Sequence, residues 1–252
     1  MKENASNSNW VENDEKLRRD LMQRFAKAQR PLGRLRLNLH IQWKRFTWRA
    51  VIKGSHTLKR AFDVLASLAA LILLSPLFLL LIVLVELDGG PIIYAQRRIG
   101  RGGKEFKMYK FRSMIVNADK LIHELRAKND LGDSVTFKMK RDPRMTPIGK
   151  WLRKLSLDEL PQFLNVLAGD MSLVGPRPCL PREIIHYTLE QRRRLDVLPG
   201  ITGLWQISGR ADIGFEGQLL MDARYLENRG FWEDLRILIL TVPAVLFGKG
   251  AY

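Results

Sequence analysis

The most restrictive feature of the sequence is an uncharged apolar run, VLASLAALILLSPLFLLLIVLV, at residues 64–85. As one straight helix, this segment would be roughly 33 Å long, enough to cross the hydrocarbon core of a bilayer. Helices buried in soluble cores rarely continue for this length without a polar residue. The run starts after residue 60 and no small-residue cleavage site follows it, so it does not have the form of a secretory signal peptide. We therefore expect a protein that lies in or on a membrane.

Basic residues flank the apolar run on both sides, and the residues alone leave two paths open. Six Lys and Arg residues lie within residues 41–60, and seven lie within residues 97–112. Basic flanks favour the cytoplasmic side, whereas a straight span would translocate one of the two clusters. Ser75-Pro76 predicts a kink or a break, because proline lacks a backbone donor and clashes with the preceding turn. A re-entrant helix would satisfy both flanks, but kinked spanning helices are also common.

Positive charge is concentrated near the beginning of the chain. The 42 Lys and Arg residues exceed the 26 Asp and Glu residues by 16, and residues 1–60 contribute 15 basic and 5 acidic side chains. Such a charge predicts an anionic partner, whether nucleic acid, an anionic membrane or a phosphorylated substrate. Residues 14–29 are typical of a basic amphipathic helix, with a solvated basic tail as the alternative. A single cysteine excludes an internal disulfide and indicates a reduced, cytosol-facing protein.

Local patterns predict an α+β fold. Alternation over residues 34–44 favours a strand or an interfacial segment. Two further alternating segments flank Arg101-Gly102-Gly103, which is typical of a β-hairpin. Helices are expected over residues 114–128, from Thr146-Pro147 to about Lys154, over 158–167 with Gly169 at the end, and over 182–195, 216–228 and 237–247.

The residues best suited to chemistry lie between positions 150 and 178. Adjacent Asp158 and Glu159 follow two basic residues, and Arg177 lies between two prolines. A carboxylate pair beside cations suits phosphate chemistry, because one acid can attack phosphorus while the other helps to hold an ion such as Mg²⁺. The alternative is structural, because Ser156-Leu157-Asp158-Glu159 matches a capping box, although Pro161 fits better if Asp158 is the cap. The residues alone do not decide between these two interpretations.

Other candidates are weaker. Arg210 could meet a phosphate, although a lone loop arginine is more often solvated. Asp222 and Asp234 could be metal ligands, but exposed helix carboxylates are commoner. The glycines at positions 100, 102 and 103 lack the ending of a phosphate-binding loop and are expected in a turn. Cys179 is expected to be a packing residue.

Several ordered segments resemble the monotopic bacterial sugar transferases, the phosphoglycosyl transferases that begin glycan assembly on a polyprenol phosphate. The resemblance covers about residues 58–252 and rests on LKRAFDV, the apolar run with Ser75-Pro76, YKFRSM, LRKLSLDELPQFLNVLAGDMSLVGPRP and PGITGLWQISGR. The segments DGGPIIYAQRRIG and FGKGAY are similar to those of the short exopolysaccharide-initiating members.

The resemblance implies a monotopic membrane protein on the cytoplasmic face of the bacterial inner membrane. Its apolar segment would be a re-entrant helix broken at Ser75 and Pro76, accompanied by interfacial amphipathic helices and a small cytosolic catalytic domain. We expect a basic N-terminal extension over residues 1–55, the re-entrant helix over 56–90 and the catalytic domain over 91–252. Anionic membrane lipids are expected partners of the extension. Nucleic acid is not expected, and homo-oligomerisation is left open.

The resemblance also implies a reaction. Asp158 would attack the β-phosphate of a UDP-sugar, release UMP and carry the sugar phosphate until undecaprenyl phosphate takes it, with glucose or galactose favoured as the sugar. Glu159 would bind Mg²⁺, with Asp158 close to the ion. The basic residues expected to neutralise phosphate oxygens are Lys110, Arg112, Arg153, Arg177 and Arg210. The rival hypotheses are a non-catalytic membrane-anchored scaffold and a nucleic-acid-binding protein, and the apolar run argues against the second.

Overall fold

Two compact units divide the chain, Met1–Leu58 and Lys59–Tyr252. The computed structural model describes residues 16–19, 22, 26, 31–118, 120–121, 139 and 142–246. Helix α2 (Pro31–Leu73) includes residues 34–44, so the expected strand there is wrong. Leucine and arginine are good helix formers, and alternation over so few residues fits either structure. The helices predicted over residues 14–29 and 114–128 lie mostly outside the described residues.

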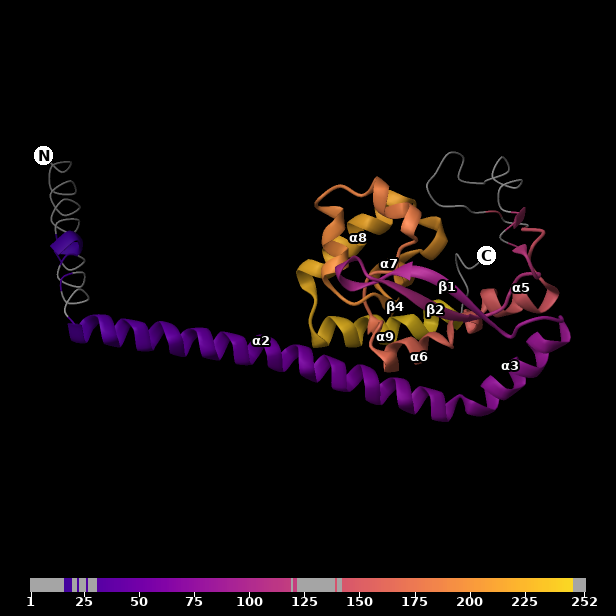
Figure 1. Ribbon diagram of the computed structural model, residues 1–252, viewed down its shortest axis with the longest axis horizontal. Coiled ribbons are helices and arrows are strands. Elements are labelled where there is room, and N and C mark those ends of the chain that lie inside the picture. The colour runs from indigo at the N-terminus through magenta and orange to yellow at the C-terminus, as the bar shows by residue number, and fades with distance from the viewer. Residues whose placement is uncertain are drawn as a thin grey trace, which may run out of the picture. The chain divides into compact units, whose positions relative to one another are not determined.

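The apolar run contains a sharp bend. Helix α2 ends at Leu73, α3 (Ser75–Leu87) follows, and the bend between them is 65° (Figure 1). It lies at the expected position, because Pro76 supplies no backbone N–H and cannot continue the hydrogen-bond ladder of α2. The Ser75 hydroxyl donates to the carbonyl oxygen of Ile72 at 2.8 Å. Among the described residues no single helix could span a bilayer, and only the bent pair has the length and composition to do so.

A β-hairpin follows, as expected. Strands β1 (Ile93–Ile99) and β2 (Glu105–Phe111) pair antiparallel, and η1 (Arg101–Gly103) joins them. Gly102 and Gly103 have φ values of 69° and 77°, a left-handed conformation that glycine adopts without a steric cost. The register places Lys110, near the end of β2, opposite Tyr94.

Two short helices follow the hairpin in the sequence. Helix α5 (Pro147–Lys154) begins as expected, because the Thr146 side chain accepts a hydrogen bond from the backbone N–H of Gly149 at 2.9 Å. Helix α6 (Gln162–Ala168) ends at Gly169, which has a φ of 93°. Apolar side chains of α3, β2 and α5 share one core, in which Phe78 and Phe111 have ring centroids 5.6 Å apart.

A second pair of strands is parallel. Strands β3 (Ser172–Val174) and β4 (Gly200–Thr202) pair through Ser172↔Gly200 and Val174↔Thr202. A Cβ atom on Gly200 would collide with the backbone of Gly175, so this close approach requires glycine. The main core cluster contains side chains from both β2 and β3, so it connects this pair to the hairpin.

The remaining elements are η4 (Pro181–His186), η5 (Gln191–Asp196), α7 (Leu204–Ser208), η6 (Arg210–Asp212), α8 (Phe215–Asn228) and α9 (Phe231–Leu246). The helix expected over 182–195 is therefore two 3-10 helices, because Tyr187 turns extended and packs its ring on Phe215 with centroids 5.9 Å apart. The helix over 216–228 is confirmed. The last helix begins before residue 237 and contains Pro243. The fold is mixed helix and sheet, compatible with the predicted α+β class.

Candidate active site

Asp158 and Glu159 lie on a short turn between two helices. The turn is η3 (Leu157–Glu159), which follows α5 and precedes α6. Ser156 has a left-handed backbone with a φ of 54° and makes no capping hydrogen bond, so the capping box is absent. Pro161 lies directly before α6, where a missing N–H leaves no hydrogen bond unmade. The helix expected over 158–167 is therefore divided, and its first part is the turn that presents the two carboxylates.

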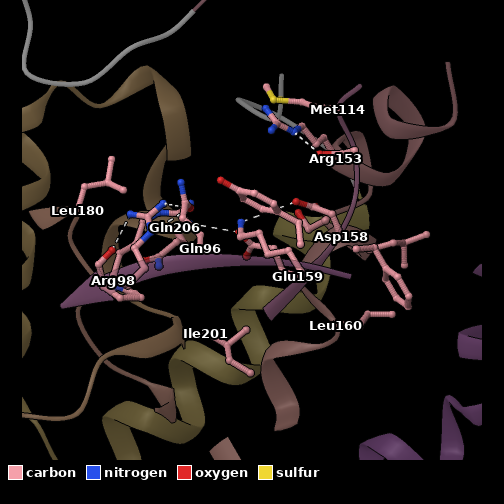
Figure 2. A pocket seen from close by; sticks show the side chains of 18 of the residues that line it. Gln96, Arg98, Met114, Arg153, Asp158, Glu159, Leu160, Leu180, Ile201 and Gln206 are labelled. Atoms are coloured by element: carbon pink, nitrogen blue, oxygen red, sulfur yellow. Dashed lines mark hydrogen bonds and ion pairs between the residues drawn. The ribbon is translucent and has the colours of Figure 1, made fainter. Parts of the chain in front are cut away.

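Both carboxylates line a cavity of about 790 Å³ (Figure 2). Charged side chains on its wall are predominantly basic. Nine basic residues line the cavity: Arg98, Lys110, Arg112, Arg144, Arg153, Arg177, Arg182, Arg194 and Arg210. Three acidic residues join them: Asp158, Glu159 and Glu183. A concave, low-dielectric wall with this excess of positive charge favours anionic ligands.

Two cations contact the carboxylate pair directly. Lys110 Nζ lies 2.6 Å from Glu159 Oε1 and 3.7 Å from Asp158 Oδ2. Arg177 Nη1 lies 3.4 Å from the same Glu159 oxygen. The sequence separates Lys110, Glu159 and Arg177 widely, and the fold brings them together from β2, η3 and the loop after β3.

The surroundings shift the pKa values of the two acids in opposite directions. Burial raises the pKa of Asp158, and the negative charge of Glu159 adds to the effect, while Lys110 opposes it. Burial also disfavours ionised Glu159, but Lys110 and Arg177 outweigh it and lower its pKa to about 2. Burial lowers the pKa of Lys110. Paired groups whose pKa values diverge in this way are characteristic of acid, base and nucleophile sites.

The other three predicted phosphate-binding residues also line the cavity, but with different partners. Arg153 Nε donates to the Ser113 hydroxyl at 3.0 Å. Arg210 has a left-handed backbone (φ 52°), and its Nη1 atom has no hydrogen-bond partner within the described part of the chain. Arg112 is buried and donates to the carbonyl oxygens of Val85, at 2.9 Å, and Gly89. The Arg112 guanidinium therefore caps the C-terminal end of α3.

The loop that carries Arg177 is held by two arginines that the sequence analysis missed. Arg98 Nη1 donates to the carbonyl oxygen of Pro178 at 2.8 Å, and Arg194 Nη2 donates to that of Arg177 at 2.9 Å. Burial and nearby Arg177 lower the pKa of Arg98 to about 10. A strand places consecutive side chains on opposite faces, so the Arg97-Arg98 pair could have indicated that one of them points inward. No comparable signal marks Arg194.

The prediction that Asp222 and Asp234 are exposed is wrong. Asp222 is buried and lies 2.6 Å from Arg194 Nη2 through its Oδ2 atom. Asp234 is also buried, forms an ion pair with Lys59 and accepts a hydrogen bond from the Tyr225 hydroxyl at 2.8 Å. Leu219, Asp222 and Tyr225 lie three residues apart on the buried face of α8. That helical spacing was a readable signal for the burial of Asp222.

The carboxylate pair has the donor chemistry that Mg²⁺ requires. Lys110 and Arg177 both contact Oε1 of Glu159 rather than its second carboxylate oxygen. The same part of the chain contains no group of three or more His, Cys, Asp or Glu that could hold a metal alone. Mg²⁺ is often bound by one or two carboxylates together with substrate phosphates and water, so the pair fits such an ion.

Comparison with known proteins finds relatives that match most of the chain. Residues 54–248 match the family described as Bacterial sugar transferase. The undecaprenyl-phosphate galactose phosphotransferase of Salmonella typhimurium is 46% identical over 203 residues, which are 79% of this chain and 43% of that protein. The exopolysaccharide production protein ExoY of Sinorhizobium fredii is 47% identical over 198 residues, 77% of this chain and 88% of that protein.

A glucose-specific name also occurs among the relatives. The undecaprenyl-phosphate glucose phosphotransferase of Komagataeibacter xylinus is 38% identical over 206 residues, 77% of this chain and 37% of that protein. The chain thus spans less than half the length of the two phosphotransferases and most of the length of ExoY. The family match includes Lys110, the carboxylate pair, Arg177 and Arg210. The protein belongs to the bacterial sugar transferase family.

Proposed function

We propose that this protein is a phosphoglycosyl transferase that moves hexose 1-phosphate from a UDP-sugar to undecaprenyl phosphate. The observation that carries the proposal is the Asp158–Glu159 pair, which lines a cavity whose charged side chains are mostly cations. The names of the galactose and glucose phosphotransferases support both the lipid acceptor and the type of group transferred. They also favour glucose or galactose as the sugar.

The first step forms a covalent aspartyl intermediate. An ionised oxygen of Asp158 attacks the β-phosphorus, a new Asp–O–P bond forms, and the bond from that phosphorus to the bridging oxygen breaks. The electron pair leaves on UMP. Asp158 must be ionised to attack. Burial raises its pKa in the free protein, and the positive charge of Lys110 opposes this and favours the reactive form.

The second step transfers the sugar phosphate to the lipid. An anionic oxygen of undecaprenyl phosphate attacks the same phosphorus, the Asp–O–P bond breaks, and the carboxylate of Asp158 is restored. The product is a diphosphate that links the lipid to the sugar, and no net proton is consumed when the acceptor is ionised. The same side chain and the same cations therefore serve both halves of the reaction.

Charge neutralisation is the main contribution of the surrounding residues. Phosphoryl transfer depends largely on positioning and on stabilising the charge that spreads over the phosphate oxygens. Lys110 and Arg177 lie closest to the acids, and Arg153 and Arg210 line the same cavity. Glu159 and Asp158 would hold Mg²⁺, which supplies further positive charge at the phosphate oxygens. Treatment with EDTA should abolish UMP release, and added Mg²⁺ should restore it.

The bent helix pair would place this site beside a membrane. Its outward side chains are large and apolar, including Leu65 (67% exposed), Leu73 (80%), Leu79 (66%) and Leu87 (74%). A patch of this kind is unusual on a soluble monomer and favours contact with lipid. We propose a re-entrant path on the cytoplasmic face of the bacterial inner membrane. A site at the membrane surface would be accessible both to the soluble nucleotide sugar and to the phosphate of the lipid carrier.

Cysteine labelling tests this topology. Leu58→Cys and Arg97→Cys place thiols at two exposed positions on either side of the apolar run at residues 64–85, while native Cys179 is buried. Both thiols should be protected from a membrane-impermeant maleimide added outside spheroplasts and should react in inverted vesicles. Labelling of only one thiol from the outside would show that the segment spans the bilayer.

The reaction itself is tested with UDP-[¹⁴C]galactose and the detergent-purified full chain. Without lipid, we expect a labelled protein adduct and one equivalent of UMP, and added undecaprenyl phosphate should release the label as glycolipid. Asp158→Asn should abolish the adduct and lower turnover about 10³-fold or more. Asp196→Asn, at an exposed position, is the control. A Asp158→Asn variant with normal turnover would refute the nucleophile, and normal glycan production in cells by that variant would favour a scaffold.

A further inference from the structure

One wall of the cavity has buried polar atoms that the protein leaves without partners. Trp205 Nε1, Gln206 Oε1 and Nε2, and Arg210 Nη1 have no hydrogen-bond partner among the described residues. All three residues lie in α7 and η6, and all three line the cavity. More than nine tenths of buried polar groups in folded proteins are hydrogen-bonded, so a cluster of exceptions requires an explanation. A ligand that supplies the missing partners is the simplest one.

The unpartnered atoms define the chemistry of that ligand. The amide of Gln206 presents one acceptor and one donor side by side, and the Trp205 indole and Arg210 guanidinium add two donors. The imide edge of uracil has the complementary pattern, because N3–H donates and the adjacent carbonyl oxygens accept. A sugar hydroxyl would match only part of this set.

The wall lies close enough to the acids to serve the same ligand. The Arg177 guanidinium lies 5.8 Å from the centroid of the Trp205 ring, and its Nη1 lies 3.4 Å from Glu159 Oε1. Arg177 thus connects the wall to the carboxylate pair. Figure 2 shows Gln206 on the side of the cavity near Gln96 and Arg98, away from Asp158. A nucleotide with its β-phosphate at Asp158 would direct its base toward this opposite wall of the cavity.

The local backbone leaves room for the amide of Gln206. A Cβ atom on Gly203 would lie 2.8 Å from Gln206 Oε1 and 2.5 Å from the carbonyl oxygen of Gly175, so glycine leaves the room that the amide occupies. Arg210 adopts a left-handed conformation with a φ of 52°, which is sterically unfavourable for a non-glycine residue. Such strain is retained most often at ligand-binding sites.

We propose that Gln206 reads the uracil base of the donor nucleotide. Its Oε1 accepts from N3–H and its Nε2 donates to a neighbouring carbonyl oxygen, while Trp205 and Arg210 donate to other oxygens of the nucleotide. This assignment rests on the proposed UDP-sugar donor and gives the far end of the cavity a specificity role. The carboxylate pair performs the chemistry, and α7 selects the nucleotide.

The test compares three ligands on the purified full chain by calorimetry: UMP, N3-methyl-UMP and ribose 5-phosphate. The wild-type protein should bind UMP about tenfold or more tightly than either analogue, because one analogue lacks the N3–H donor and the other lacks the base. Gln206→Met, which keeps the length of the side chain, should weaken UMP binding about tenfold and leave ribose 5-phosphate binding unchanged. Equal binding of UMP and N3-methyl-UMP by the wild type would overturn the proposal without any variant.

A matched control separates this role from a general effect of losing an amide in the cavity. Gln218 also lines the cavity, but its Nε2 already donates to the carbonyl oxygen of Ile213 at 2.9 Å. Gln218→Met should therefore leave the preference for UMP intact. Equal weakening of UMP and ribose 5-phosphate by Gln206→Met would show that the amide contacts the ribose or phosphate, and would refute base reading. Failure of the proposed reaction has a different signature, since UMP would then not form from UDP-galactose although the base preference persisted.

Discussion

Two clusters of acids and cations differ in their access to solvent. In the first, Glu159, Lys110 and Arg177 have side chains 20%, 14% and 32% exposed, and they line the cavity. In the second, Arg194 and Asp222 are 8% and 2% exposed, and Arg194 makes further hydrogen bonds to Tyr187 and to the backbone of Arg177. The first cluster lines the cavity with partly exposed side chains, whereas the second, although Arg194 also lines the cavity, is almost fully buried and makes its contacts within the protein.

The difference in solvent access fits two different roles, contact with a phosphate for the first cluster and positioning of a loop for the second. A cation that has to meet a phosphate must remain accessible, as Arg177 does with a side chain that is 32% exposed. A cation that fixes a loop must be saturated by the protein, because a buried charge without partners is strongly destabilising. Arg194 connects the two clusters, since it is held by Asp222 and holds the carbonyl oxygen of the residue that contacts Glu159.

The largest effect that distinguishes the clusters is on stability. Asp222→Asn leaves Arg194 as a buried cation without a counter-charge, and breaking such a pair costs about 3–5 kcal/mol. We expect a clearly lower denaturation midpoint in calorimetry of the purified protein. Asp158→Asn serves as the contrasting variant, because it removes a buried charge whose ionisation the fold already disfavours, and it should melt no lower than the wild type. If both variants melted alike, the division between the clusters would be wrong.

A smaller effect concerns the rate. Arg194→Lys keeps the charge but cannot reach Tyr187, Asp222 and the Arg177 carbonyl together, so it should lower kcat about tenfold. In an Arg177→Ala background the same change should have no further effect, because Arg194 acts through Arg177. UMP release kinetics of the four proteins give the coupling. Arg193→Lys, at an exposed neighbouring position, is the control. Additive losses would mean that Arg194 stabilises the fold without positioning Arg177.

The smallest effect is a shift in pH dependence. In the proposed reaction Asp158 must be ionised, and its pKa lies above the ordinary aspartate value, so kcat/KM should fall on the acid side at a pH above the usual aspartate range. The positive charge of Lys110 lowers that pKa, so Lys110→Met should move the acid limb to higher pH. Lys107→Met, at an exposed position on the same strand, should leave it in place. A limb that stayed fixed or moved to lower pH in Lys110→Met would contradict the assignment of the titrating group to Asp158.

Patterns that depend on neighbours in the chain were readable from the sequence. The hairpin around Arg101-Gly102-Gly103, the start of α5 at Thr146-Pro147 and the end of α6 at Gly169 follow from turn and capping chemistry. The bend of the apolar run lies at the expected proline. The strand expected over 34–44 failed because a short alternation does not distinguish strand from helix.

Contacts between distant segments were not readable in the same way. No local pattern reveals that Arg98 and Arg194 approach the loop around Arg177 from two different elements. Tyr187 interrupts an expected helix because its ring packs on Phe215. The carboxylate pair was recognised from its motif, but its lack of a capping bond depends on the backbone conformation of Ser156, which sequence alone does not reveal.

Arg112 has a mechanical consequence. It donates to the carbonyl oxygens of Val85, in the last turn of α3, and of Gly89, just after that helix, and it lies two residues beyond Lys110 in the sequence. A displacement of α3 would therefore move Arg112 and the adjoining end of β2, which carries Lys110. The ammonium group of Lys110 contacts Glu159. On the membrane path proposed above, a thicker or thinner bilayer that displaces α3 would displace Lys110 with it.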